Sequence, residues 1–112
     1  AALHTREMTL RYLSYRSRTA LSQGRPLGPE SSVAKLANGI LRGDMAEAAL
    51  AILGPDGTLA DDAPDGGSWT EGFLFSLASR IGGGTEQVQR NIIAERVLGL
   101  PREPRPTAPS SR

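Results

Sequence analysis

Apolar residues recur at intervals of three and four positions along most of the chain, which is the spacing that predicts amphipathic α-helices. Two long segments show this spacing, followed by a short segment and then by a fourth that Thr85 opens. No segment alternates between apolar and polar residues as a half-buried strand would. The pattern therefore predicts an all-α fold, an up-and-down helical bundle of about four helices, over residues 1–23, 29–53, 69–80 and 85–99.

The first segment carries two neighbouring apolar stripes, so its helix is expected to touch other elements on more than one side. The stripes comprise Leu3, Leu10, Leu13, Ala20 and Leu21 in one row and Met8, Tyr12 and Tyr15 in the other. In the second segment, Gly39 and Gly43 are small residues of the kind that allow close helix contact. We expect apolar surface to stay exposed around Leu10, Tyr12 and Ile40, where a second copy or further chain would cover it.

Turn-forming residues fill the stretch from Gly54 to Ser68, which is a long loop for a compact domain and so either functional or mobile. Its aspartates suggest calcium, but their spacing does not match an EF-hand and no glutamate closes the loop. A solvated acidic loop is the better interpretation of Asp56, Asp61, Asp62 and Asp65. In the short helix that follows, Trp69, Phe73 and Leu77 share one face and are expected to be core or interface anchors.

Composition narrows the classes of function. The 112 residues carry a net charge of +1, which argues against nucleic acid or an anionic membrane as a partner. No apolar run approaches the roughly 20 residues of a membrane span. Without cysteine the chain has no disulfide framework and no thiolate metal site, and we expect no metal. His4 is the single histidine and is expected to be a bystander. A cytoplasmic protein is predicted.

The two ends of the sequence suggest a piece of a longer protein. The start has no signal-peptide core and no initiator methionine, and it resembles the interior of a helix. Residues 1–101 are expected to form an incomplete helical domain. Residues 102–112 are rich in proline, serine and arginine without periodicity, and they are predicted to be a flexible tail.

Three consecutive glycines, Gly82 to Gly84, precede the fourth helix and provide a backbone that a ligand or another chain segment can approach. Thr85 stands where a helix N-cap belongs, and Gly99 with Pro101 is expected to end the helix. Such a helix start leaves free N–H groups and a partial positive charge, which suits a phosphate. Taken alone, this pattern is more often an ordinary hairpin corner than an anion site. It matches neither a P-loop nor a dinucleotide fingerprint.

The continuous stretch over residues 83–101, GGTEQVQRNIIAERVLGLP, resembles the end of the flavin-dependent acyl-CoA dehydrogenases. The resemblance implies the C-terminal helical bundle of an oxidoreductase of fatty acid metabolism. Such enzymes remove hydrogens from the α and β carbons of an acyl-CoA, with a carboxylate taking the proton and FAD the hydride. It also implies FAD as cofactor, acyl-CoA as substrate, electron-transfer flavoprotein as acceptor, and a homo- or hetero-oligomer.

The same resemblance suggests site residues. Gly84, Thr85 and Gln87 match positions at which the family contacts FAD. Gly83 occupies the position of the catalytic Glu in many members, so no catalytic residue is assigned here. Ala51 stands where the family has a flavin-contacting Gln, which places one cofactor hydrogen bond in doubt. In the family, a base can also come from an earlier helix, or from a second subunit that pairs with a subunit lacking it.

Three hypotheses follow. The chain is the C-terminal part of an FAD-dependent acyl-CoA dehydrogenase, inactive by itself, and Thr85 and Gln87 motivate this first hypothesis. Alternatively, it belongs to a base-less partner subunit of a heteromeric dehydrogenase, which Gly83 motivates. A stand-alone helical interaction module without a flavin is the third.

Overall fold

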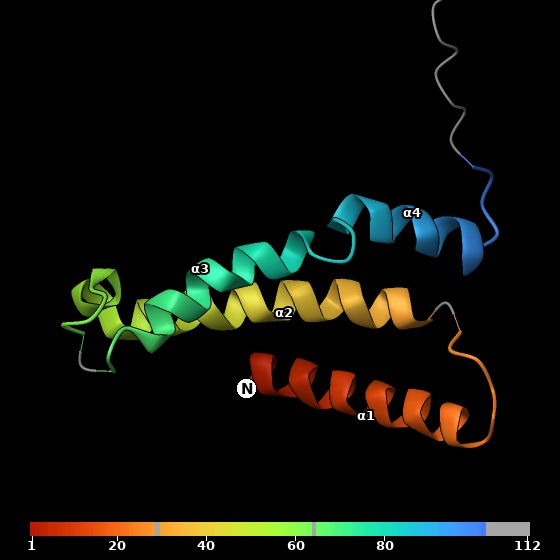
Figure 1. Ribbon diagram of the computed structural model, residues 1–112, viewed down its shortest axis with the longest axis horizontal. Coiled ribbons are helices and arrows are strands. Elements are labelled where there is room, and N and C mark those ends of the chain that lie inside the picture. The colour runs from red at the N-terminus through yellow and green to blue at the C-terminus, as the bar shows by residue number, and fades with distance from the viewer. Residues whose placement is uncertain (29, 64, 103–112) are drawn as a thin grey trace, which may run out of the picture.

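A computed structural model describes residues 1–28, 30–63 and 65–102. Its α-helices are α1 (Ala2–Ser22), α2 (Glu30–Leu53), α3 (Ser68–Ile81) and α4 (Glu86–Arg96), and a 3-10 helix, η1 (Gly54–Thr58), follows α2 directly (Figure 1). No strand occurs within these ranges. The predicted all-α fold of four helices is therefore confirmed, while the tail predicted for residues 102–112 lies outside the described residues from residue 103 onward.

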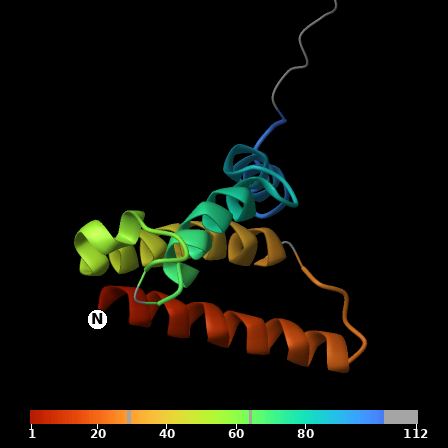
Figure 2. The ribbon, with the colours of Figure 1, turned by 60° about the vertical axis from the view of Figure 1, so that its left-hand side comes forward.

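Helix α2 is the central element of the fold. It contacts α1, α3, α4 and η1. Figure 1 shows α1 running along one side of α2 in the opposite direction, with α3 and α4 along the other side. The chain does not reverse between α3 and α4 (Figure 1), and the turned view in Figure 2 shows α3 crossing α2 at an angle, with α4 seen nearly end-on. An ion pair between Arg6 Nη1 and Asp44 Oδ2, 2.5 Å apart, connects α1 to α2.

Two glycines on α2, which the sequence predicts to lie at a helix contact, face α3. Gly39 and Gly43 are both buried. A Cβ added to Gly39 would lie 3.8 Å from Arg80 Cγ and 3.9 Å from Arg80 Cα. A Cβ added to Gly43 would lie 3.8 Å from Arg80 Nη1. The C-terminal turn of α3 thus rests on the glycine face of α2, and Arg80 extends along that face.

The stretch predicted as a loop over residues 54–68 is more ordered than expected. Its first five residues form η1. Thr70 Oγ1 of α3 donates to the carbonyl oxygens of Gly57, at 3.1 Å, and Leu59, at 2.8 Å. The prediction of turn structure throughout is therefore wrong for η1, because the backbone of this segment finds hydrogen-bond partners on α3.

Asp65 caps the start of α3 rather than acting as a solvated acid. Its Oδ2 accepts hydrogen bonds from the Trp69 amide, at 2.8 Å, and from Ser68 Oγ, at 2.9 Å. These donors, the Trp69 amide first, hold the pKa of the Asp65 carboxyl below its usual range. Because the folded-state pKa is depressed, the cap stabilises the helix fully above the unfolded value of about 3.9 and loses its effect as the pH falls through the folded value.

Replacing Asp65 with asparagine, which removes the charge but keeps an acceptor oxygen, is expected to loosen the first turn of α3 at neutral pH. Hydrogen exchange of the Trp69 amide should accelerate by about fivefold at pH 7, because a neutral amide oxygen accepts more weakly than a carboxylate and adds no negative charge at the helix start. The difference from the wild type should shrink as the pH falls below about 3.9. Asp61→Asn, a change at an exposed acid of the same loop, is the control. Equal exchange rates in the two variants at pH 7 would contradict the capping role.

Little apolar surface is buried in this arrangement. Among the described residues, the buried hydrophobic ones are Leu41, Ala46 and Ala63. The prediction of an exposed apolar surface is confirmed at Tyr12, which is 63% exposed. Leu10 and Ile40 are instead half-buried, because α1 and α2 contact each other. Ile52 at the end of α2, Phe75 and Ile81 of α3, and Leu98 after α4 are more exposed than Tyr12.

The third helix buries less of its predicted face than expected. Trp69 is 47% exposed and Leu77 48% exposed, while Phe73 is half-buried. Trp69, Met45 and Phe75 line an open groove between α2 and α3. The prediction of core anchors is therefore wrong for Trp69 and Leu77, and their role as interface anchors stays a prediction. None of the helices in the described ranges combines the length and the apolar character that a membrane crossing requires.

Candidate functional site

The glycine turn, residues 82–84, joins α3 to α4 without reversing the chain, so it is not a hairpin corner (Figure 1). The Gly82 amide donates a hydrogen bond to the Ala78 carbonyl of α3, at 2.9 Å, and the Gly84 amide donates to the Ile81 carbonyl, at 3.1 Å. Gly84 has a φ of +103°, a conformation that residues with side chains rarely adopt. The turn is therefore a defined structure rather than a loose link.

Thr85 is the N-cap of α4, as predicted. Its φ of −62° and ψ of 166° are extended, and its Oγ1 accepts a hydrogen bond from the Val88 amide at 3.3 Å. Because the oxygen serves as acceptor in this cap, the hydroxyl hydrogen can be donated to a ligand. The amides of Glu86 and Gln87, in the first turn of the helix, have no acceptor within the helix. The start of α4 thus presents several donors.

The two glutamines of α4 point in different directions, although only two positions separate them. Gln87 is exposed, whereas Gln89 is buried, 6% exposed, and donates from Nε2 to the Gly83 carbonyl at 2.9 Å. Sequence reasoning singled out Gln87 and missed Gln89. The helical period indicates that Gln87 and Gln89 lie on different faces, since residues two apart in sequence lie on roughly opposite faces of a helix.

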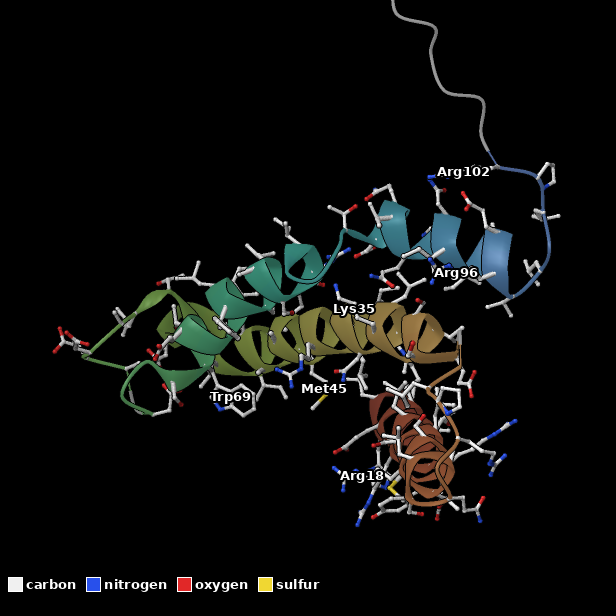
Figure 3. The ribbon with its side chains drawn as sticks, turned by 45° about the vertical axis from the view of Figure 1, so that its right-hand side comes forward. Arg18, Lys35, Met45, Trp69, Arg96 and Arg102 are labelled. Carbon is white, nitrogen blue, oxygen red and sulfur yellow. The ribbon has the colours of Figure 1, made fainter. Side chains whose placement is uncertain are left out.

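Lys35 of α2 also reaches the glycine turn. Its Nζ donates to the Gly84 carbonyl at 2.8 Å and lies 3.5 Å from the Ser79 carbonyl. Figure 3 shows Lys35 on the side of α2 that faces α4, whereas Met45 and Trp69 lie on the other side. Sequence reasoning missed Lys35 as well, but a signal was available, because this residue is the single lysine among 13 basic residues.

Glu86 is engaged in an ion pair with Arg80, across the glycine turn. Arg80 Nε donates to Glu86 Oε1. This hydrogen bond, together with the charge of Glu86, raises the pKa of the Arg80 guanidinium above its usual range. The pair connects α3 to α4 and balances the negative charge that Glu86 would otherwise add to the start of α4. Glu86 is therefore a structural residue here.

Two positions at which the sequence departs from the resembling family are also placed. Gly83 has a φ of +71°, and a Cβ there would lie 3.7 Å from Lys35 Cε, so there is space for a side chain but the backbone disfavours one. Ala51 lies near the end of α2, 16 positions beyond Lys35, or about 24 Å along a helix. Within one chain, the structure therefore does not bring Ala51 to the glycine turn.

The remaining candidates contribute little to this site. His4 Nδ1 lies 3.6 Å from Glu7 Oε2 on the exposed side of α1. Within residues 1–28, 30–63 and 65–102, no group of three or more histidine, cysteine or acidic side chains could hold a metal ion. At its other end, α4 finishes at Arg96 with Val97 as its C-cap in a right-handed conformation, so the helix ends before Gly99, which was predicted to end it. Gly99 itself has a left-handed φ of +67°.

These features describe an all-α domain in which a glycine turn opens a threonine-capped helix. A family model described as acyl-CoA dehydrogenase, C-terminal domain, matches residues 1–98. The chain therefore belongs to the family of acyl-CoA dehydrogenase C-terminal domains, which confirms the resemblance seen in the sequence.

Two curated relatives are both called acyl-CoA dehydrogenase IpdE1. The protein from Mycobacterium tuberculosis is 43% identical over 75 residues, and that from Mycolicibacterium smegmatis is 44% identical over 75 residues. Each match covers 66% of this chain and 19% of the relative, so the chain corresponds to about a fifth of their length. No solved structure matches the chain.

Proposed function

We propose that this chain is the C-terminal part of an FAD-dependent acyl-CoA dehydrogenase and contributes cofactor contacts and a subunit interface. The observation that carries the proposal is the start of α4, where Thr85 caps the helix and Gln87 is exposed directly after the glycine turn. Both residues stand at positions where the resembling family contacts FAD. Membership of the family and the printed names of the relatives support the same reaction class.

The donors at this helix start fit the chemistry of a phosphate-bearing cofactor. The Thr85 hydroxyl, the amides of Glu86 and Gln87 and the Gln87 side chain can donate to an anionic group, and the helix dipole favours negative charge there. Glycines at positions 83 and 84 keep side chains away from the approach. When bound, FAD would supply the hydride-accepting chemistry of the dehydrogenation. The residues of this chain would bind and orient it.

A catalytic base is not assigned to this chain. Gly83, at the position of the family's glutamate, has no group that can take a proton, and Glu86 is paired with Arg80. This observation favours a second candidate function, a base-less partner subunit in a heteromeric dehydrogenase. Full activity of the full-length gene product purified alone would rule that candidate out.

The burial pattern argues against a stand-alone interaction module, the third hypothesis. Within residues 1–28, 30–63 and 65–102, the buried hydrophobic residues are Leu41, Ala46 and Ala63, a small core for an independent domain. Exposed apolar side chains on α3 and α4 are instead compatible with cover from further chain or from another subunit. Acyl-CoA as substrate, electron-transfer flavoprotein as acceptor, an oligomeric assembly and a cytoplasmic location remain parts of the proposal.

Loss of both proposed FAD contacts tests the assignment. In the full-length gene product, Thr85→Val combined with Gln87→Leu is expected to weaken flavin binding by tenfold or more, because two hydrogen-bonding side chains are removed. Thr85→Ser is the matched control, since it keeps both the hydroxyl and the helix cap. Flavin content is read from the visible absorption spectrum. Unchanged flavin content in the double variant would refute the site.

The spectrum of the wild-type protein tests the reaction class separately. A flavin spectrum that bleaches on addition of an acyl-CoA would establish a dehydrogenase. Flavin without bleaching would point to a base-less partner subunit or to a different acyl group, and a full-length protein that takes up no flavin would overturn the proposal.

A further inference from the structure

The glycine turn is held by side chains from two helices, and this arrangement has a consequence for the proposed cofactor site. Three consecutive glycines lose more conformational entropy on ordering than other residues, so a fixed shape needs compensating bonds. Lys35 of α2 donates to the Gly84 carbonyl at 2.8 Å, and Gln89 of α4 donates to the Gly83 carbonyl at 2.9 Å. Two successive carbonyls of the turn are therefore each tied by a side chain.

The direction of these bonds affects what the start of α4 can bind. A carbonyl oxygen carries partial negative charge and would repel an anionic group approaching Thr85. Lys35 and Gln89 draw the oxygens of Gly84 and Gly83 toward α2 and the buried side of α4. Gln89 is itself nearly fully buried, so its amide is fixed by packing as well as by its bond.

The choice of lysine at position 35 is consistent with this role. The other 12 basic residues of the chain are arginines. An ammonium is a compact charge with three donors, and it can serve the Gly84 carbonyl while lying 3.5 Å from the Ser79 carbonyl. The planar guanidinium of arginine is larger and directs its donors in a fixed fork, which suits carboxylates and phosphates better than two backbone carbonyls on neighbouring elements.

We infer that Lys35 and Gln89 are positioning residues that hold the carbonyls of the glycine turn away from the cofactor side, so that the donors of Thr85, Glu86 and Gln87 face an anionic ligand. This inference rests on the proposed function for its consequence, cofactor affinity. The ordering of the turn itself is independent of any cofactor.

Lys35→Met tests the inference in the full-length gene product. Methionine keeps the length and the packing of the side chain but removes the charged donor. Affinity for added FAD, measured by titration of the apoprotein, is expected to fall about tenfold, as for the loss of one charge-assisted hydrogen bond. Hydrogen exchange of the Gly84 and Val88 amides, which bond to the Ile81 carbonyl and to Thr85 Oγ1, is expected to accelerate in the same variant without FAD.

Arg42→Met is the matched control. Arg42 lies seven residues beyond Lys35 on the same face of α2, and its Nε donates to Asn38 Oδ1 of the same helix at 3.2 Å. The control should leave both FAD affinity and exchange in the turn unchanged. Gln89→Met removes the second donor and should accelerate exchange in the turn even if Lys35→Met fails to fold.

The outcomes separate the two proposals. Wild-type protein that binds FAD together with a Lys35→Met variant that binds it equally well would overturn the inference and leave the proposed function standing. Wild-type protein that binds no FAD would overturn the proposed function, and exchange in the turn would still decide the positioning role. Unchanged exchange in both the Lys35 and the Gln89 variants would overturn that role.

Discussion

Replacing Gly67 with alanine is expected to destabilise the junction before α3 more than any other single change considered, by about 2–4 kcal/mol. Gly67 is the N-cap residue of α3, with a φ of +75°. A Cβ at this position would lie 2.6 Å from the Ala60 carbonyl oxygen and 2.8 Å from the Ala60 carbonyl carbon. These atoms belong to the backbone and cannot rotate away, so the whole segment from η1 to α3 would have to shift.

Gly66→Ala separates this clash from the cost of the backbone conformation alone. Gly66 has a similar φ of +64°, but a Cβ there meets nothing within 4 Å. Its expected cost is therefore only the roughly 1–2 kcal/mol of a left-handed conformation. Native-state hydrogen exchange of the α3 amides in the full-length gene product measures both values. Equal losses in the two variants would show that the close approach to Ala60 contributes nothing.

Replacing Gly84 with alanine is expected to have the largest effect on cofactor binding, a loss of affinity for FAD of at least tenfold. The φ of +103° is strained for any residue with a side chain. In addition, a Cβ would lie 2.8 Å from Gln89 Nε2, and the amide would have to leave the Gly83 carbonyl to make room. Both effects disturb the turn directly before Thr85, whose hydroxyl we propose as a cofactor contact.

The neighbouring glycines provide graded controls in the same turn. Gly82 has an ordinary φ of −58°, and a Cβ there would contact the Ala78 carbonyl oxygen at 3.4 Å, so Gly82→Ala should be nearly neutral. The loss of FAD affinity in Gly83→Ala should lie between those of the other two variants. Gly83 has a left-handed φ of +71°, but a Cβ there would make an ordinary contact of 3.7 Å. Titration of the apoprotein with FAD measures the affinity of each variant and so gives their order. Three equal affinities would contradict the role of the turn conformation.

The glycine turn also explains why a glutamate cannot simply be restored at position 83. A side chain would fit the space, since Lys35 Cε lies 3.7 Å from a Cβ built there. The left-handed backbone, however, is a conformation that glutamate rarely adopts. Gly83→Glu would therefore have to change the backbone of the turn before its carboxylate could take a useful position. The absence of a base at this position and the conformation of the turn are consistent with each other.

Local features of this protein were predictable because neighbouring residues decide them. The helical spacing of apolar residues and the Thr85 cap depend on interactions within a few positions of the chain, and both are confirmed. The cap of α3 shows the limit of this approach. Asp65 lies only four residues from the Trp69 amide that it binds, yet the four aspartates of its loop together favour a solvated acid when composition alone is considered.

Burial could not be predicted from periodicity in the same way. Spacing identifies which side chains share a face of a helix, but another element must then cover that face. Trp69 and Leu77 share the predicted face of α3 and are both half exposed, because the described elements cover that face only in part. The up-and-down order predicted for the bundle would reverse the chain between α3 and α4, whereas the structure does not reverse it there (Figure 1). Local sequence does not decide this direction, since a glycine turn permits both a reversal and a continuation.

The sequence by itself thus determined the all-α class, the helix starting at Thr85 and, through the stretch over residues 83–101, the family. Only the tertiary structure revealed the contacts that hold the candidate site. Lys35 and Gly84 are 49 positions apart, and the inward orientation of Gln89 depends on the rotation of α4 against α2. The physical reason is that a hydrogen bond between distant residues depends on how helices pack, and packing is set jointly by all the faces in contact.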